Sequence, residues 1–557
     1  MDSPKTATIK VDNRNIQRPW DDSDLVTDWS AFPHGYGILL NERLMFPEDL
    51  CLWRMKIDQT RQLFVDDYLI AHQRNLKRQF HSPQDHPANP LLIDCMGGQF
   101  GTDEVHGYRL YYAARGRTRV AFSNDGLHWD KPDLNVCDQP ADVPPDEPNN
   151  AIDIPGIFGI FHEPNDPDES QRWKAISGPR TQVTWPYAVQ PVRRRPAWRG
   201  GPKTPPPPTP PEPLRASLHD LYVSPDGIRW TRKSPTSLPK GPAGLHAPYL
   251  RPTGISDMLQ IRWDPKLKTY IANTKHTIGP DLRMSPVFHV GRVVTVCESD
   301  DLIHWSTPRV YAYPDGEDAK MPGMYGIYEA DGFPYESMWL NQFSMSWYHP
   351  ASEEEIRTHK LMPTRPYIKR NRIRLTGSRD GRHWYYLGDR RPFIDLGSEG
   401  SWKPHYLRMI NRHTVGGPLL RNDELWFYYR GMDIDRFKNL WVSSMGVAIL
   451  RRDGFASLNA TDEPGLVITR PLAFEGEGKL FVNADVATNG YVRASVIAED
   501  GSAIDGFTED DCQSVAEDST CSRIGWGRNE TLGNLKDRYV RLAFHLTSAK
   551  LYSFWIE

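Results

Sequence analysis

Residues 123–129 read SNDGLHW, a phrase of the form S-x-D-G-x-x-W that returns three times along the chain. The other copies are SPDGIRW at 224–230, SDDLIHW at 299–305 and SRDGRHW at 378–384. Each phrase follows a short β-rich run, so it predicts a strand, a tight turn and a second strand opening on Trp. The Asp accepts hydrogen bonds from turn N–H groups, and the Gly supplies a positive φ. A hairpin unit repeated at long spacing is typical of the four-stranded blades of a β-propeller.

The composition favours an all-β protein and excludes some partners. The chain has 557 residues, with 67 Lys and Arg against 71 Asp and Glu, for a net charge of −4. This balance leaves no basic footprint for nucleic acid, and no apolar run of about 18 residues predicts a membrane-spanning helix. The 18 Trp and 24 Tyr favour strands. Aromatic residues often line sugar sites, but we expect most of these Trp to pack between blades.

The pattern of the sequence divides the chain into three parts. Residues 1–60 show no clear period and are interpreted as an N-terminal extension contributing to the propeller, and residues 61–465 as the catalytic propeller. In residues 466–557 the phrase is absent, and alternating runs such as KLFVNADV and YVRLAFHL predict a β-sandwich. The proline-rich stretch 190–213 predicts a surface excursion, because proline has no N–H to donate to a sheet.

Some features indicate secretion. Cys512 and Cys521 flank a polar loop and could form a disulfide, and the sequons at Asn459 and Asn529 fit a secreted chain. The first residues, MDSPKTATIKV, are not a signal peptide. We interpret the chain as a mature extracellular protein with an added Met, with an intracellular protein as the alternative, and we expect a monomer.

Several phrases together resemble a family of secreted carbohydrate-active propellers. They are LFVDDYLI at 63–70, YGIYEADGFPYE at 325–336, GSEGSW at 397–402, LRRDGFASL at 450–458 and RLAFHL at 541–546. The chain is similar to the L-rhamnose-α-1,4-D-glucuronate lyases of polysaccharide lyase family 42, to propeller ulvan lyases and to glycoside hydrolase family 145. Over residues 61–557 the resemblance implies a seven-bladed β-propeller with a C-terminal β-sandwich and a structural calcium ion. It also implies an acidic plant polysaccharide as partner, cleaved by β-elimination at the terminal rhamnosyl-glucuronate of gum arabic side chains.

The resemblance further implies two catalytic His about twenty residues apart in an early blade. His86 and His106 have this spacing and are the predicted catalytic pair. A uronate lyase must remove the proton on C5 and expel the sugar at O4, and His can act as base or acid near neutral pH. Many relatives carry Asp after GSEGSW, but this chain has Lys403, which disfavours a carboxylate-dependent hydrolase at that position.

A uronate substrate also needs cations and hydrogen-bond donors around its carboxylate. The predicted substrate-binding residues lie near strand ends, with Lys275 as a further candidate. They are Arg180, Tyr187, Arg215, His276, Glu329, Trp347 and His349. The sequence assigns no metal ligands.

Two other functions stay open from the sequence. A glycoside hydrolase, such as an α-L-rhamnosidase-like enzyme, would need two carboxylates about 5 to 9.5 Å apart. Candidates for this pair are Asp66, Asp67, Asp103, Glu329, Asp331 and Glu336. A non-catalytic sugar-binding propeller would only hold its ligand. A lyase alone forms a C4=C5 double bond conjugated to the carboxylate, which absorbs in the ultraviolet.

Overall fold

The structure is a computed structural model that describes β1 (Ile38–Leu39) and residues 54–557 with gaps. The gaps are 139–143, 145, 190–211, 241–258, 278–291, 307–308, 313–323, 351, 359–366, 436–439 and 537. The described chain is almost entirely β-structure, so the predicted all-β class is confirmed. Its helices are α2 (Glu353–Thr358) and 3-10 turns at Glu169–Gln171, Gly388–Arg390 and Gly533–Leu535. None of these helices is long and apolar enough to cross a membrane.

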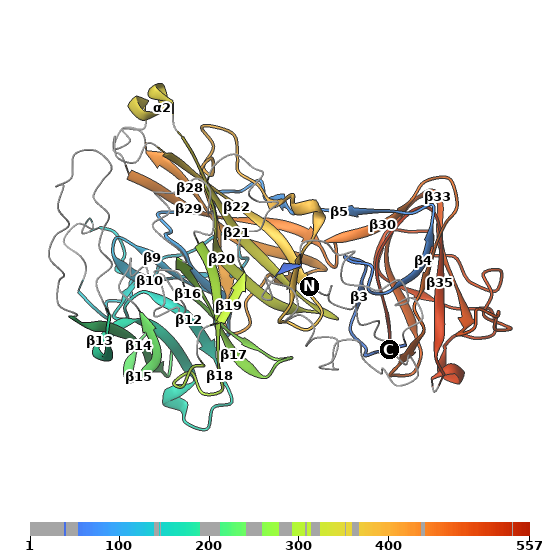
Figure 1. Ribbon diagram of the computed structural model, residues 1–557, viewed down its shortest axis with the longest axis horizontal. Coiled ribbons are helices and arrows are strands. Elements are labelled where there is room, and N and C mark those ends of the chain that lie inside the picture. Colours follow the sequence, from blue (N-terminus) through green and yellow to red (C-terminus); the bar gives the residue numbers. More distant parts are fainter. Residues whose placement is uncertain are drawn as a thin grey trace, which may run out of the picture.

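The larger of two lobes contains five successive antiparallel groups of strands (Figure 1). The first three groups are β8 (Gly98–Asp103), β9 (Gly107–Ala114), β10 (Arg117–Ser123) and β11 (Ala151–Ile152); β12 (Ile157–His162), β13 (Trp173–Val189), β14 (Glu212–Ser224) and β15 (Thr231–Lys240); and β16 (Leu259–Asp264), β17 (Thr269–Thr277), β18 (Arg292–Ser299) and β19 (Arg309–Ala312). The last two are β20 (Met324–Tyr335), β21 (Met338–Pro350), β22 (Tyr367–Ser378), β23 (Trp384–Tyr386) and β24 (Pro392–Ile394); and β25 (Tyr406–Met409), β27 (Leu419–Arg421), β28 (Glu424–Asp435), β29 (Leu440–Arg451), β6 (Gln84–Asp85) and β7 (Leu92–Ile93).

These groups close into a propeller-like ring. The strands β6 and β7 precede the first group in the chain but pair with β29 of the last group. The short strand β26 (Asn411–Arg412), which follows β25, pairs in parallel with β8 of the first group. The described strands therefore form five blade-like groups, of which the last two are joined into one sheet by the pair β22–β25, and the predicted seven blades are not confirmed. Each interval between two successive phrases holds a single group of long strands.

The four S-x-D-G-x-x-W phrases occupy equivalent places, each after the third strand of its blade, which confirms the predicted repeat. In every copy the Asp Oδ1 accepts hydrogen bonds of 2.7–2.8 Å from the N–H groups two and three residues later. The residue after this Asp has a positive φ in all four copies, including Leu302 at 65°, which replaces Gly. The Asp side chain therefore holds the turn even where Gly is absent.

The smaller lobe is a C-terminal β-domain whose ten strands form one hydrogen-bonded network around one core (Figure 1). They are β2 (Met55–Ile57), β3 (Gln62–Leu63), β4 (Ile70–Arg74), β5 (Lys77–Phe80), β30 (Ala456–Ala460), β31 (Gly465–Thr469), β32 (Leu472–Phe474), β33 (Leu480–Ala498), β34 (Ser519–Ile524) and β35 (Val540–Ile556). Two stacked sheets stay a prediction.

The strand pairing corrects the predicted domain boundaries. Residues 55–80 supply four strands that pair with β30, β31, β32 and β35 of the C-terminal domain, and not with the blades. The domain therefore combines 55–80 with 456–557, where the prediction began it at 466. Of the predicted N-terminal extension 1–60, β1 pairs in parallel with β23 of the fourth blade. Most of the proline-rich stretch lies outside the described residues.

The possible disulfide between Cys512 and Cys521 is not formed, and both are free thiols. The Cys512 Sγ faces the core and accepts a hydrogen bond from the Ala494 N–H at 3.2 Å. Cys521 is exposed on β34. The two side chains therefore point into different environments.

Asp453, in the LRRDGF phrase, joins the two lobes through a buried carboxylate. Its Oδ2 forms an ion pair with Arg61 at 2.8 Å and accepts a hydrogen bond from Ser553 at 2.6 Å, both in the C-terminal domain. Its Oδ1 accepts a hydrogen bond of 2.8 Å from Tyr335, at the end of β20 in the fourth blade. One carboxylate thus fixes the blade end to the smaller lobe.

We expect Asp453→Ala to destabilise the protein by about 3–5 kcal/mol, because it leaves the buried Arg61 cation without its partner. The midpoint of urea denaturation measures this change. The control is Asp423→Ala, since Asp423 is half exposed and pairs with Arg452 at the surface; it should cost about 1 kcal/mol or less. Equal losses in the two variants would contradict the role of Asp453.

Candidate active site

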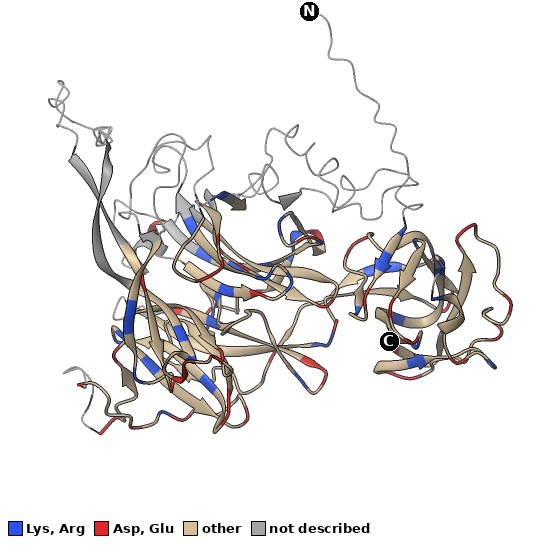
Figure 2. Cartoon of the chain, turned by 90° about the horizontal axis from the view of Figure 1, so that it is seen from below, with Lys and Arg blue, Asp and Glu red and all other residues tan. Residues whose placement is uncertain are grey.

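Figure 2 shows acidic and basic residues interspersed over both lobes of the described chain. Buried charges are more informative, because a charge is removed from water at high cost unless it is paired. Among the described residues, several buried polar groups with unpaired atoms lie on or next to the inner strands of the blades, and these are Arg262, Glu329, Asp331, Asn411 and His413.

The inner strand β20 places two carboxylates at this axis. Glu329 and Asp331 are two residues apart, so their side chains lie on the same face of the strand, and both are buried. Glu329 Oε1 accepts hydrogen bonds from Arg408 Nε at 2.5 Å and from Gln260 Nε2 at 2.7 Å. Its second oxygen, Oε2, has no protein partner. The site therefore holds a paired carboxylate with one oxygen available.

Asp331 lies deeper, in a different electrostatic environment. Burial, aided by the negative charge of Glu329, raises the pKa of Asp331 to about 7, although Arg262 and the Gly417 N–H act in the opposite direction. Its Oδ2 has no protein partner, and neither amide atom of Gln342, its cross-strand neighbour, has one. A narrow enclosed gap beside it, too small for a water molecule in this structure, is lined by Gln260, Ile261, Arg262, Asp331, Asn411, Arg412 and Gly416. Asp331 can therefore hold a proton near neutral pH at the edge of this gap.

One end of the axis is covered by residues 410–417, here called the axial segment. His413 N–H donates to the Phe100 carbonyl of the first blade at 2.6 Å, and Thr414 N–H to the Ile160 carbonyl of the second at 2.7 Å. The Thr414 carbonyl accepts from Trp263 N–H of the third blade at 2.6 Å. At Gly101 a Cβ would lie 1.8 Å from His413 Nε2, so only glycine allows this crossing.

The structure does not bring the predicted catalytic pair into contact. His86 is half-buried next to Trp426 and lines a cleft of about 490 Å³ with Asp85, Asp423 and Glu424. His106 is exposed in the β8–β9 hairpin, with its ring 4.2 Å from that of Phe122. No contact described for either ring joins it to the other or to the axis. Their catalytic role stays a prediction.

Of the predicted substrate-binding residues, Glu329 lies at the axis. Trp347 is half-buried on β21, with the Arg372 guanidinium 4.8 Å from its ring. The side chains of the other five lie outside the described residues, and these are Arg180, Tyr187, Arg215, His276 and His349.

The other carboxylates considered for a hydrolase are engaged elsewhere. Asp66 is fully buried in an ion pair with Arg379 at 2.6 Å, and Asp67 pairs with Arg78. Asp103 pairs with Arg109 at 2.6 Å, and Glu336 with Arg452 at 3.4 Å.

Sequence reasoning missed most of the axial partners, among them Gln260, Arg262, Arg408, Asn411 and Arg430. They come from different blades and share no phrase. One signal was available: Asn411, His413 and the pair Gly416-Gly417 form a polar, glycine-bearing run between two strands.

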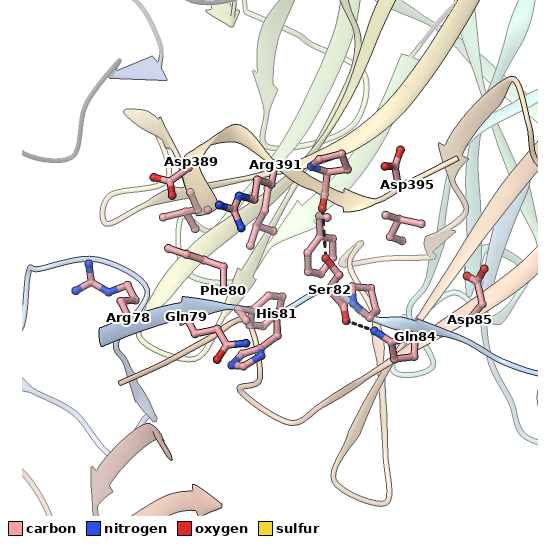
Figure 3. Close-up of a pocket in the computed structure, with 18 of the residues that line it drawn as sticks. Arg78, Gln79, Phe80, His81, Ser82, Gln84, Asp85, Asp389, Arg391 and Asp395 are labelled. Atoms are coloured by element: carbon pink, nitrogen blue, oxygen red, sulfur yellow. Dashed lines mark hydrogen bonds between the residues drawn. The ribbon is translucent and has the colours of Figure 1, made fainter. Parts of the chain in front are cut away.

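A cleft of about 990 Å³ lies elsewhere, between β5–β6 and residues 387–396 (Figure 3). Its charged groups are exposed or engaged, since Asp85 pairs with Lys403 at 2.6 Å and Asp395 with Arg372 at 2.7 Å. Ser82 donates a hydrogen bond across it to the Pro392 carbonyl. This cleft therefore lacks the unpaired buried acids that distinguish the axis.

The described residues gather no group of three or more His, Cys, Asp or Glu side chains that could hold a metal ion. The described residues thus offer no such group as ligands for the calcium ion that the resemblance implies, and this ion stays a prediction.

No family model matches the chain, and no curated protein matches it. Solved structures of enzymes acting on carbohydrates are similar to it. An N-acetylgalactosamine deacetylase from F. plautii shares 14% identity over 69% of this chain and 97% of its own, with a TM-score of 0.36. A family 43 arabinoxylan arabinofuranohydrolase from Bacillus subtilis shares 10% identity over 82% of this chain and 78% of its own, with a TM-score of 0.25. A fructofuranosidase from Schwanniomyces occidentalis shares 10% identity over 86% of this chain and 96% of its own, with a TM-score of 0.30. Sequence identities and TM-scores this low assign no function to the chain.

The raised pKa of Asp331 makes stability depend on pH. The folded state keeps a proton that the unfolded chain releases above the ordinary value of 3.8, so stability falls as pH rises toward 7. We expect Asp331→Asn to be more stable than the natural chain at about pH 8, with this advantage lost at about pH 4. Melting temperatures of both proteins across this range measure the effect. A constant difference at all pH values would contradict it.

Proposed function

We propose that the protein is a carbohydrate-active enzyme that hydrolyses a glycosidic linkage, with Glu329 and Asp331 as its acid–base pair. The observation that carries this proposal is two carboxyl groups on one face of an inner strand, held in different environments, each with an oxygen that no protein group satisfies. A carboxyl group with a raised pKa beside a second carboxyl group in a different environment is the usual arrangement for simultaneous acid and base catalysis.

The spacing of the pair suits this chemistry. Side chains two residues apart on a strand are separated by about 6.6–6.8 Å along it. This lies within the range of about 5 to 9.5 Å found for the two carboxyl groups of glycosidases. Asp331, protonated up to about pH 7, would give its proton to the leaving oxygen. Glu329, ion-paired with Arg408, would act on the anomeric carbon or on a water molecule.

The surroundings of the pair support a sugar as the ligand. The half-buried amide of Gln260 and the buried amides of Asn411 and Gln342 lie beside the carboxylates and can exchange hydrogen bonds with hydroxyl groups. The rings of Tyr328 and Tyr406 meet edge-on at 5.7 Å beside Glu329. Hydroxyl-binding amides next to aromatic rings match the mixed polar and apolar faces of a sugar.

β-Elimination at a terminal rhamnosyl-glucuronate is the second candidate, with His86 and His106 as its acid–base pair. The observation that favours it is the exposed His106 ring, which rests on Phe122 and is open to a polymer. In this case the partner would be an acidic plant polysaccharide, and the enzyme a secreted monomer with structural calcium, as the resemblance implies.

The two candidates predict different inactive variants. Under the hydrolase proposal, Glu329→Gln and Asp331→Asn each lower turnover roughly 10²–10⁴-fold, whereas His106→Phe and His86→Ala keep it. Asp67→Asn is the control, since Asp67 is half exposed in a surface ion pair. The assay incubates the protein with rhamnosyl-glucuronate polymer and with neutral plant polysaccharides, and follows released sugar and ultraviolet absorbance together.

Released sugar without ultraviolet absorbance supports hydrolysis. An ultraviolet-absorbing product that disappears in His106→Phe, with Glu329→Gln still active, would replace the hydrolase by the lyase. If no polysaccharide yields product but one of them binds, the protein is a sugar-binding propeller and the proposal fails.

A further inference from the structure

Two guanidinium groups converge at one end of the axial site. The Nη1 atoms of Arg408 and Arg430 each lie 3.8 Å from the position that a Cβ would take at Gly97. Gly97 carries no side chain, and its φ of 107° is one that glycine adopts readily. Arg408 keeps 18% of its side chain exposed, so this end is not sealed. A Cβ at Gly97 would be in van der Waals contact with both guanidinium groups, so the two cations lie on either side of the same backbone position.

The charges at this end do not balance. Arg408 is paired with Glu329, but the hydrogen bonds of Arg430 go to neutral acceptors. These are the Ser443 Oγ at 2.6 Å, the Met96 carbonyl at 2.8 Å, the Met432 Sδ at 2.7 Å and the Met96 Sδ at 3.8 Å. Arg430 is 6% exposed, and no ion pair to a carboxylate is found for it among the described residues. Burial and the neighbouring Arg408 lower the pKa of Arg430, as expected for a cation short of counter-charge.

We propose that Arg408 and Arg430 together bind an oxyanion, either the carboxylate of an acidic sugar or inorganic phosphate. Guanidinium groups bind both through paired, charge-assisted hydrogen bonds. The bound anion would supply the negative charge that Arg430 lacks and would place the ligand directly beside Glu329. The inference rests on the proposed function, because it names the chemical class of ligand for the same axial site.

Calorimetric titration of the full chain tests this inference with three probes, D-glucuronate, inorganic phosphate and uncharged D-glucose. We expect one of the two oxyanions to bind at least about 10-fold more tightly than glucose, and the tighter one identifies the source. Arg430→Gln and Arg408→Gln should weaken this binding roughly 10- to 100-fold, and Arg430→Lys by less, since it keeps the charge. The control is Arg229→Gln, because Arg229 is 72% exposed in a surface pair and should leave binding unchanged.

The inference is overturned if the natural chain binds no oxyanion more tightly than glucose, or if a folded Arg430→Gln or Arg430→Lys binds as well as the natural chain. Melting temperatures identify variants that do not fold, and the probe comparison on the natural chain then decides. Loss of turnover in Glu329→Gln without oxyanion binding defeats this inference alone. Oxyanion binding with full turnover in Glu329→Gln defeats the proposed hydrolase alone.

Discussion

The structure depends on how the inner edges of the blades satisfy their backbone groups. A strand edge presents unpaired N–H and C=O groups, and inner strands cannot leave them buried without partners. At one end of the axis the axial segment provides these partners, contacting the first three blades with Phe100, Ile160 and Trp263. Main-chain hydrogen bonds satisfy the N–H and C=O groups at this end of the axis. The closure of the ring therefore does not depend on hydrogen bonds from side chains at the axis.

This closure leaves the side chains of the inner strands free for other work. The polar groups of β16, β20 and β25 face one another across a small space, where hydrophobic residues would pack better and cost less. Gln260, Glu329 and Arg408 instead form a connected network with unpaired oxygens at its margin. A buried network of this kind destabilises the fold unless a ligand completes it, and this is the physical reason for placing the active site here.

Local chemistry explains which parts of the fold could be predicted from the sequence. The phrase turns were predictable because Asp and the residue after it act within five residues, and even Leu302 adopts the positive φ that the turn requires. The blade number and domain boundaries depend on pairing between distant strands, such as β3 with β35, which no local pattern reports. At the site, Glu329 and Asp331 were among the candidates because they stand in a strand. Their partners Arg408 and Arg262 were missed because only ring closure brings the blades together. The spacing of His86 and His106 does not put them in one blade, since residues 84–93 close the last blade while His106 belongs to the first, and their catalytic role stays a prediction.

Two groups of buried carboxylates in this molecule separate structural roles from chemical ones. Asp66 accepts from Arg379 at both oxygens and from Tyr385, and Asp453 is satisfied by Arg61, Tyr335 and Ser553. Both stand in phrases, LFVDDYLI and LRRDGFASL, that carry the resemblance described from the sequence, yet neither has an oxygen left to meet a substrate. Glu329 and Asp331 are equally buried, but each keeps one oxygen unpaired, and the cation Arg430 nearby has no carboxylate of its own. A fold gains nothing from leaving such groups uncompensated, and this is why we propose the ligand site at the uncompensated set and not at the phrases that carry the resemblance.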